Sequence, residues 1–276
     1  MMGVMTGVTT SGGMTEVGIR RDGRWSGSVT SRPLPDDASL DDLSPMQRLT
    51  LADVWMGRAA SERRVADSFV VVRDALASLE AADELVQLAT RAIDDEMRHA
   101  ELARDVASRY AREPLAHPPR LVLTIPLHPG ASERLRHVLH VIGQCAFNET
   151  IASAFLEAAL AEATAPLARA ALRELLSDEI DHARIGWALL GSLDRKMLDQ
   201  VERWLPAMAI ANLRMWRETN RTYGSDAKLA AHGAPRVESV ENALLLAFRD
   251  LIVPGFEHLG LATDAIRTWL EAGAPT

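Results

Sequence analysis

The chain has 276 residues, of which 47% are hydrophobic and 25% are charged, a composition typical of a globular protein with a substantial core. A formal net charge of −8 and the lack of a basic run argue against binding to nucleic-acid phosphates. The single cysteine excludes an internal disulfide and a four-cysteine metal site, and it fits a reducing compartment, so we expect a cytoplasmic protein. No run of about 18 apolar residues is present, and we expect no membrane-spanning helix.

Residues 1–44 lack the pattern of a packed domain, and we expect a flexible N-terminal segment. Residues 1–15 are rich in Gly, Thr and Met, and residues 31–44 contain two prolines and several aspartates, which is typical of a linker. Between these stretches, the pair Asp22-Gly23 lies among alternating residues and can form the turn of a small hairpin.

From Ser44 onward the pattern is that of an all-α protein. Ser44 is a favourable N-cap, and Pro45 suits the first position of a helix. Apolar residues then recur at spacings of three and four, as on the buried face of a helix. The periodicity and its interruptions predict four long helices at about residues 45–79, 82–112, 132–162 and 166–193.

The connections between these helices are short, long and short. Short connections make neighbouring helices antiparallel, whereas residues 113–131, with five prolines, are long enough to cross a bundle. This order predicts a four-helix bundle with one crossover over residues 45–193. Additional helices that pack on it are expected within residues 194–276, at about 195–220 and 237–271, with interruptions at Pro206 and Pro254 and a loop at 224–235.

Two of the four helices contain the same Asp-Glu-x-x-His motif. It occurs as Asp95-Glu96-Met97-Arg98-His99 and again as Asp178-Glu179-Ile180-Asp181-His182. Residues i and i+3 lie on one face of a helix with Cβ atoms about 5–6 Å apart, so a glutamate and a histidine at this spacing can bind one metal ion. One such pair alone is a weak signal.

The other two helices each place one glutamate on a small or apolar face. These residues are Glu62, in the first helix, and Glu149, in the third. Burying four unpaired carboxylates would cost several kcal/mol each, so a positive charge has to compensate them. Two divalent cations would balance four carboxylates, and two neutral imidazoles would complete the ligands.

With these residues in these positions, the sequence resembles the ferritin-like di-iron carboxylate superfamily. In that superfamily one Glu from each of two helices joins a Glu-x-x-His from each of the other two. The resemblance covers about residues 45–193 and implies a ferritin-like bundle with two Fe ions, for which Mn is an alternative. It implies that the metal ligands, which are also the catalytic residues, are Glu62, Glu96, His99, Glu149, Glu179 and His182.

The resemblance also implies roles around these ligands. Glu96 and Glu179 would bridge the two metals. Asp95 would orient the histidine of the opposite helix, His182, and Asp178 would orient His99, since a metal-bound histidine donates its other N–H to a carboxylate. Leu175 stands where the arylamine N-oxygenases of this superfamily have a seventh, histidine ligand, which argues against that activity.

The function implied is that of an O2-dependent non-haem di-iron oxidoreductase: a monooxygenase, oxidase or desaturase acting on a small organic substrate. Two Glu-x-x-His motifs differ from the asymmetric ferroxidase site of animal-type ferritins, and the additional helices can wall a pocket or form a homodimer surface. Bacterioferritins and manganese catalases also use two such motifs, so a ferroxidase, peroxidase or catalase is the alternative. No nucleotide-binding or flavin-binding fingerprint is present, and we expect a separate electron donor.

Two other residues with ligand chemistry lie near Glu149 in the sequence. His140 falls on the face opposite Glu149. Cys145 lies one turn before Glu149 on the same face, where it is expected to be a small core residue, and a position in the wall of the substrate pocket is the alternative. Neither tyrosine is placed beside the site by its spacing. Arg98 and Asp181 lie between ligands and are expected to form an ion pair with each other, either solvated or between helices.

Overall fold

The computed structural model describes residues 18–19, 25–26, 33–220 and 224–275, which belong to two compact units, Met1–Ser31 and Arg32–Thr276. In the first unit, strand β1 (Gly18–Ile19) pairs antiparallel with β2 (Trp25–Ser26), and Ile19 lies opposite Trp25. The turn expected at Asp22-Gly23 lies outside the described residues.

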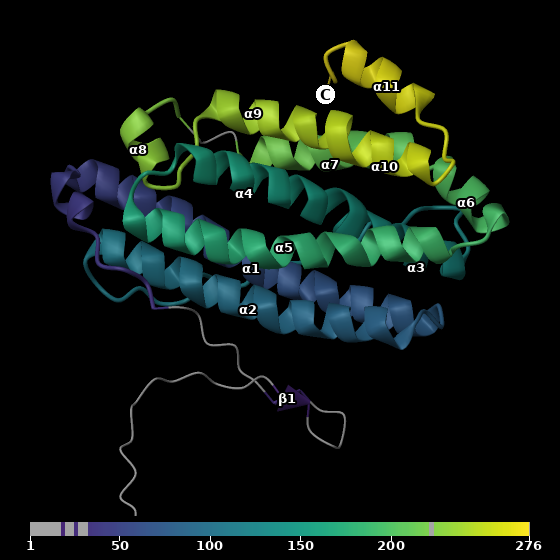
Figure 1. Cartoon of the computed structure of the whole chain (residues 1–276), viewed down its shortest axis with the longest axis horizontal. Helices are drawn as coiled ribbons and strands as arrows, with labels where there is room; N and C mark the ends of the chain where they lie inside the picture. The colour runs from purple at the N-terminus through teal and green to yellow at the C-terminus, as the bar shows by residue number, and fades with distance from the viewer. Residues whose placement is uncertain (1–17, 20–24, 27–32, 221–223, 276) are drawn as a thin grey trace, which may run out of the picture. The chain divides into compact units, whose positions relative to one another are not determined.

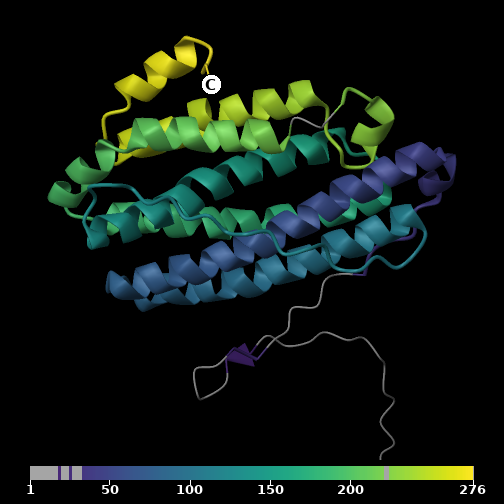
Figure 2. The same cartoon turned by 180° about the vertical axis from the view of Figure 1, so that it is seen from behind.

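All regular secondary structure in the described residues of the second unit is helical, which confirms the prediction of an all-α protein. Four long helical rods lie side by side in its first half (Figure 1; Figure 2). The second rod packs on the first and fourth, the third also contacts the first and fourth, and the third is built from three consecutive segments. The rods are α1 (Pro45–Ser78), α2 (Asp83–Ala111), α3–η2–α4 (Glu133–Val141, Ile142–Glu149 and Thr150–Glu162) and α5 (Pro166–Ser192).

The helices begin where the sequence provides caps. Ser44 Oγ accepts a hydrogen bond from the Gln47 backbone at 3.2 Å, and the Gln47 side chain accepts one from the Ser44 backbone at 3.1 Å. These two reciprocal hydrogen bonds form a capping box at the start of α1. The first residue of the helix is Pro45, which has no backbone N–H, and a residue at this position does not need one. At the start of α3, Ser132 Oγ accepts a single hydrogen bond from the Leu135 backbone at 3.3 Å.

The third rod differs from the uniform α-helix that the sequence predicts. Its central segment η2 is a π-helix, with backbone hydrogen bonds from i+5 to i, between the α-helical segments α3 and α4. Apolar periodicity does not reveal so short a change of register. Because η2 ends at Glu149, the π-helix determines where this predicted metal ligand points.

The long connection between α2 and α3 lies along α1. Arg63 Nη1 donates to the Pro118 carbonyl at 3.1 Å, and Arg120 forms an ion pair with Asp67 of α1. Farther along, Val122 and Leu127 are 87% and 83% exposed. Arg63 of α1 and Arg120 of the connection itself therefore hold an otherwise extended segment against α1.

The segment 33–44 is fixed to the helices, in contrast to the flexible linker that we expected. Asp37 accepts a hydrogen bond from the Leu167 backbone at 3.0 Å, and Arg109 donates to the carbonyls of Leu34 and Pro35. Leu43 is buried, and the short 3-10 helix η1 (Ala38–Asp42) lies before it. The Arg109 side chain of α2 and the Leu167 backbone at the start of α5 therefore provide hydrogen-bond partners that are distant in the sequence.

Further helices lie over α4 (Figure 1; Figure 2). α9 contacts α4, α7 contacts η2, and α6 contacts α3. A short helix, α8, occupies part of the loop expected at 224–235. The bounds are α6 (Arg195–Glu202), α7 (Leu205–Thr219), α8 (Ala227–Ala231), α9 (Val237–Leu246), η3 (Ala247–Ile252), α10 (Val253–His258) and α11 (Asp264–Glu271).

Pro254 does not interrupt its helix as predicted. It lies in the first turn of α10, directly after the π-helix η3, and the rod continues through it to His258. A proline in the first turn lacks a donor that the turn does not use. Pro206 similarly lies in the first turn of α7, and the chain breaks just before it, at Arg203 and Trp204.

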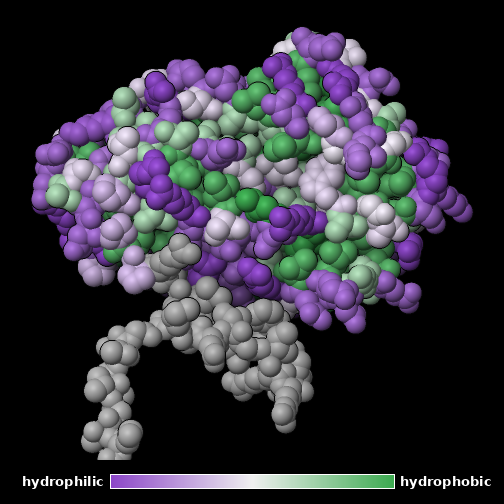
Figure 3. Space-filling model, in the orientation of Figure 1, coloured by the Kyte–Doolittle hydropathy of each residue, from purple (hydrophilic) through white to green (hydrophobic). Residues whose placement is uncertain are grey.

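None of the described helices is both long enough and apolar enough to cross a lipid bilayer. On the face seen in Figure 3, hydrophilic side chains are interspersed with apolar ones. The large side chains Trp55, Phe69, Tyr110, Phe147 and Phe248 are completely buried among the helices.

Candidate metal centre

The six predicted ligands come together in the middle of the four rods. Five are buried and Glu62 is partly accessible, although α1 places it in the same cluster. In each of two groups, one ligand atom per residue lies within 4.8 Å of the others. The groups are Glu62, Glu96, His99 and Glu179, and Glu96, Glu149, Glu179 and His182. Since Glu96 and Glu179 belong to both groups, they are placed where a bridging ligand would lie.

Both histidines turn the same ring nitrogen towards these shared glutamates. His99 Nδ1 lies 3.7 Å from a carboxylate oxygen of Glu96 and 3.7 Å from one of Glu179. His182 Nδ1 lies 3.0 Å from Glu96 and 3.2 Å from Glu179. The i, i+3 spacing in α2 and α5 therefore brings each imidazole to the same pair of carboxylates.

The outer ring nitrogens face the two aspartates that precede the motif glutamates. His99 Nε2 lies 3.0 Å from Asp178 Oδ2, and His182 Nε2 lies 3.6 Å from Asp95 Oδ2, which is longer than a hydrogen bond. Each aspartate comes from the opposite helix. A carboxylate at Nε2 keeps the proton on that nitrogen and leaves the Nδ1 lone pair free for a metal ion.

Two arginines of α2 neutralise these aspartates. Arg98 forms ion pairs with Asp178, with Glu174 at 2.7 Å and with Asp95 at 3.3 Å. Arg91 lies 3.2 Å from the Asp95 carboxylate. Burial would raise the pKa of Asp178, but the hydrogen bonds from His99 and Arg98 outweigh burial and lower this pKa to about 2.

The prediction of an ion pair between Arg98 and Asp181 is wrong. Asp181 instead pairs with Arg184, three residues along the same helix, at 2.5 Å. Asp181 follows the motif glutamate by two residues, which turns it away from the face that α5 presents to α2. Glu174, which takes its place as the partner of Arg98, lies more than one turn before the motif and had no local sequence signal.

The negative charge gathered in the cluster favours the binding of cations. Burial and the neighbouring charges of Glu96 and Glu179 raise the pKa values of Glu62 and Glu149 well above the usual range. Burial disfavours the charged form of His99, but the hydrogen bond to Asp178 and the nearby negative charge of Glu96 outweigh it and raise this pKa to about 10. Protons bound to these side chains therefore supply positive charge that would otherwise have to come from cations.

Glu96 provides the direct test of whether metal ions fit. Its two carboxylate oxygens and His99 Nδ1 are completely buried, yet none has a well-directed hydrogen bond among the described residues. The contacts of His182 and His99 hold the pKa of Glu96 at about 2 against the effect of burial. An ionised carboxylate with unsatisfied oxygens, beside an unsatisfied imidazole nitrogen, fits coordination of a divalent cation.

Two amide side chains that have no signal in the sequence hold Glu149. The Gln144 and Asn148 side chains both donate to Glu149 Oε1, the latter at 3.3 Å. In an α-helix, residues five apart point about 140° away from each other, but a π-helix brings them to one side. Gln144 is therefore within reach of Glu149 because η2 is a π-helix. Ser68 of α1 donates to Gln144 at 2.7 Å and fixes its orientation.

A glycine sets the distance between η2 and α5. A Cβ atom at Gly186 would lie 2.5 Å from the Ala146 backbone nitrogen and 2.9 Å from the Cys145 Cβ. The two rods therefore approach more closely than any side chain at this position would allow. Gly186 lies one turn after His182, and this approach brings Glu149 to the candidate ligands of α5.

The residues that were not expected to be ligands lie outside the two ligand groups. Cys145 is completely buried against Gly186, and Leu175 is buried in the core. Tyr110 is buried against His232, with its hydroxyl 3.1 Å from the His232 Nδ1. His140 contributes to a pocket on the other side of η2.

No protein-family model matches the chain, and no curated protein sequence matches it. The geometry of the buried cluster is therefore the guide to the function of the protein.

Proposed function

We propose that the protein is a ferritin-like, O2-dependent non-haem di-iron oxidoreductase that oxidises a small organic molecule. The observation that supports this most is the pair of overlapping ligand groups that share Glu96 and Glu179. Two ions bridged by two carboxylates, each with one imidazole and one further carboxylate, would have the arrangement of a dinuclear redox centre.

Iron suits the donor set, which consists of oxygen and neutral nitrogen atoms, and manganese is the nearest alternative. When bound, two ferrous ions would supply two electrons to O2. The chain provides the surroundings. Asp178 and Asp95 hold the imidazole rings, Arg98 balances these aspartates, and packed helices exclude water from the buried glutamates.

A pocket beside the centre favours an organic substrate over metal storage. It has a volume of about 540 Å³, and its lining includes Gln144 and Asn148, the residues that contact Glu149. Pockets of about 300–1,000 Å³ are typical of small-molecule sites. A ferroxidase needs only a path for iron and O2.

The first test is metal analysis with assays of oxygen consumption. We expect two iron ions per chain after anaerobic reconstitution, and O2 uptake by the reduced protein that is faster with an organic substrate than with ferrous ion or peroxide. Faster turnover of ferrous ion or peroxide than of every organic compound tested would instead assign a ferroxidase, peroxidase or catalase.

The second test removes both imidazoles. His99→Ala combined with His182→Ala should abolish binding of two metals and activity, because each group loses its nitrogen ligand. The control is His258→Ala, which removes an exposed histidine outside the cluster. Two tightly bound metals in the folded double variant would refute the ligand assignment.

A further inference from the structure

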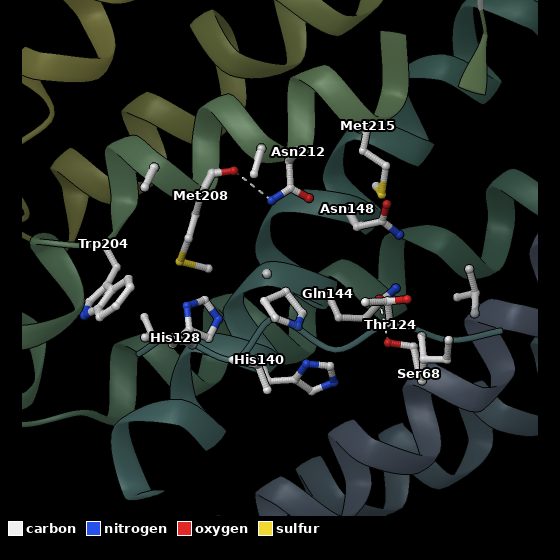
Figure 4. A pocket seen from close by; sticks show the side chains of 18 of the residues that line it. Ser68, Thr124, His128, His140, Gln144, Asn148, Trp204, Met208, Asn212 and Met215 are labelled. Atoms are coloured by element: carbon white, nitrogen blue, oxygen red, sulfur yellow. Dashed lines mark hydrogen bonds between the residues drawn. The ribbon is translucent and has the colours of Figure 1, made fainter. Parts of the chain in front are cut away.

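The 540 Å³ pocket lies between α1, the connection at 122–129, the α3–η2 rod and α7. Figure 4 shows Met208, Asn212 and Met215 of α7 facing His128 and Gln144 across the open space. Segments that are distant in sequence therefore build this pocket, and its walls belong to both halves of the chain.

One wall of the pocket is also the outer face of the metal centre. Gln144 lines the pocket, accepts a hydrogen bond from Ser68 and donates one to Glu149. Asn148 lines the pocket as well, donates to Glu149 and accepts from the Trp216 indole at 3.0 Å. A single layer of amide side chains thus separates the pocket from a carboxylate of the cluster.

The lining is mostly apolar and has one permanent charge, Arg64. None of the residues that line the pocket is acidic, and Arg64 has no ion pair or hydrogen bond to the described part of the chain. Burial lowers the pKa of His140 to about 4 and also lowers that of His128, so both imidazoles are neutral near pH 7. This chemistry fits a molecule with an apolar body and one acidic group.

The wall formed by the connection is weakly held. Residues 121–127 make no backbone hydrogen bond to any described residue. Its neighbours are held by the Arg120–Asp67 ion pair on one side and by the edge-to-face contact of His128 with Trp204 on the other. A ligand can enter if this wall moves aside, without loss of any helix.

We propose that this pocket binds the organic substrate, an amphipathic molecule whose acidic group is recognised by Arg64 and whose apolar body lies against Met208 and Trp204. The part to be oxidised then lies at Gln144 and Asn148, next to Glu149. That the bound molecule is a substrate rests on the proposed function, whereas its binding to the pocket does not.

Binding is tested on the metal-free protein with anilinonaphthalene sulfonate, a fluorescent aromatic anion. We expect one site per chain. Ala211→Trp, an exposed pocket position on α7, should weaken binding by about tenfold or more, because the indole fills the space. The control Ala188→Trp, on an exposed face of α5 outside the pocket, should not weaken it. Equal affinities of the wild type and Ala211→Trp would overturn the proposal, and Ala207→Trp repeats the test if Ala211→Trp melts lower than the wild type.

The acidic group is tested by comparison with neutral N-phenylnaphthylamine. Arg64→Gln should weaken binding of the sulfonate severalfold and leave the neutral compound unaffected, since one partly exposed ion pair is lost. Arg173→Gln, which changes an exposed arginine of α5, should affect neither probe. Equal loss of both probes in Arg64→Gln would refute recognition of an acidic group.

Proximity to the centre is tested by metal substitution. Proton resonances of the bound sulfonate should broaden in the Mn²⁺-loaded protein and stay sharp in the Zn²⁺-loaded protein, because only Mn²⁺ is paramagnetic. Broadening that is absent with Mn²⁺ demonstrably bound would overturn the position of the pocket beside the metals. Failure of the metals to bind would instead refute the proposed function and leave the results of the two affinity tests standing.

Discussion

The two histidines of the cluster differ in how closely their outer nitrogens are held. His99 Nε2 makes a 3.0 Å contact with Asp178, which Arg98 also holds, whereas His182 Nε2 is 3.6 Å from Asp95. An imidazole with a firmly held Nε2–H keeps its Nδ1 lone pair directed at the metal. The ring of His99 should therefore depend more on its aspartate than the ring of His182 does.

Asp178→Asn should lower metal affinity by about 10–100-fold, the range for residues that support a ligand, and Asp95→Asn should lower it less. The reason is that an amide no longer fixes the proton on the histidine nitrogen. Competition with a chelator measures the affinities. Asp181→Asn, on the same helix but paired with Arg184, is the control, and an equal loss in that variant would mean that general helix stability is responsible.

At the scale of helices, the shared faces of the candidate ligands could be predicted from the sequence because spacing in an α-helix is a local property. Glu96 and His99 share a face whatever surrounds them, and so do Glu179 and His182. Ser44 and Pro45 likewise fix the start of α1 by local hydrogen bonding. Such features do not depend on contacts distant in sequence.

The π-helix and the residues that depend on it could not be predicted in the same way. Gln144 reaches Glu149 only in the π register, and Arg98 finds Glu174 only after α2 and α5 have packed. Asp37 also finds its partner 130 residues away. Each of these contacts is decided by tertiary packing, which the periodicity of one segment does not encode.

Gly186→Ala should destabilise the protein by about 1–3 kcal/mol, because its methyl group would collide with backbone and Cβ atoms of η2. It should also weaken metal binding, since Glu149 moves away with η2. Thermal melting and chelator competition measure the two effects.

The matched control is Gly191→Ala, near the end of α5, where a Cβ would have no neighbour within 4 Å. This change should be neutral or stabilising by up to about 1 kcal/mol, because alanine favours a helix over glycine. A comparable loss of stability in both variants would mean that the close approach of the rods is not the cause.

For the whole molecule, we expect the cluster to make stability depend on pH and on metal together. The pKa values of Glu62, Glu149, His99 and His182 are raised in the metal-free fold. A group with a raised pKa stabilises the fold at low pH, and this contribution is lost as pH rises through the raised pKa. The lowered pKa of Glu96 acts in the opposite sense, but only below about pH 4.5.

We therefore expect the metal-free protein to melt at a lower temperature than the metal-loaded protein, with a difference that grows from about pH 5 to pH 8. Metal binding releases the protons and strengthens as pH rises. Free metal at about 100-fold its Kd would add about 3 kcal/mol of stability. Melting curves of both forms across this range measure the difference. A difference that shrinks with rising pH would show that the four glutamates are not a buried cluster.

The exposed segment 121–127 also divides the ligands evenly, three on each side. Cleavage there would leave one fragment with Glu62, Glu96 and His99 and another with Glu149, Glu179 and His182. Each bound ion would then join two separate polypeptides, so the metals would act as a reversible cross-link. We expect that protein nicked by brief proteolysis stays associated on gel filtration while metal is bound and separates more readily after chelation. The long connection thus divides the chain into two parts, each with half of the ligands, and metal ions can hold these parts together.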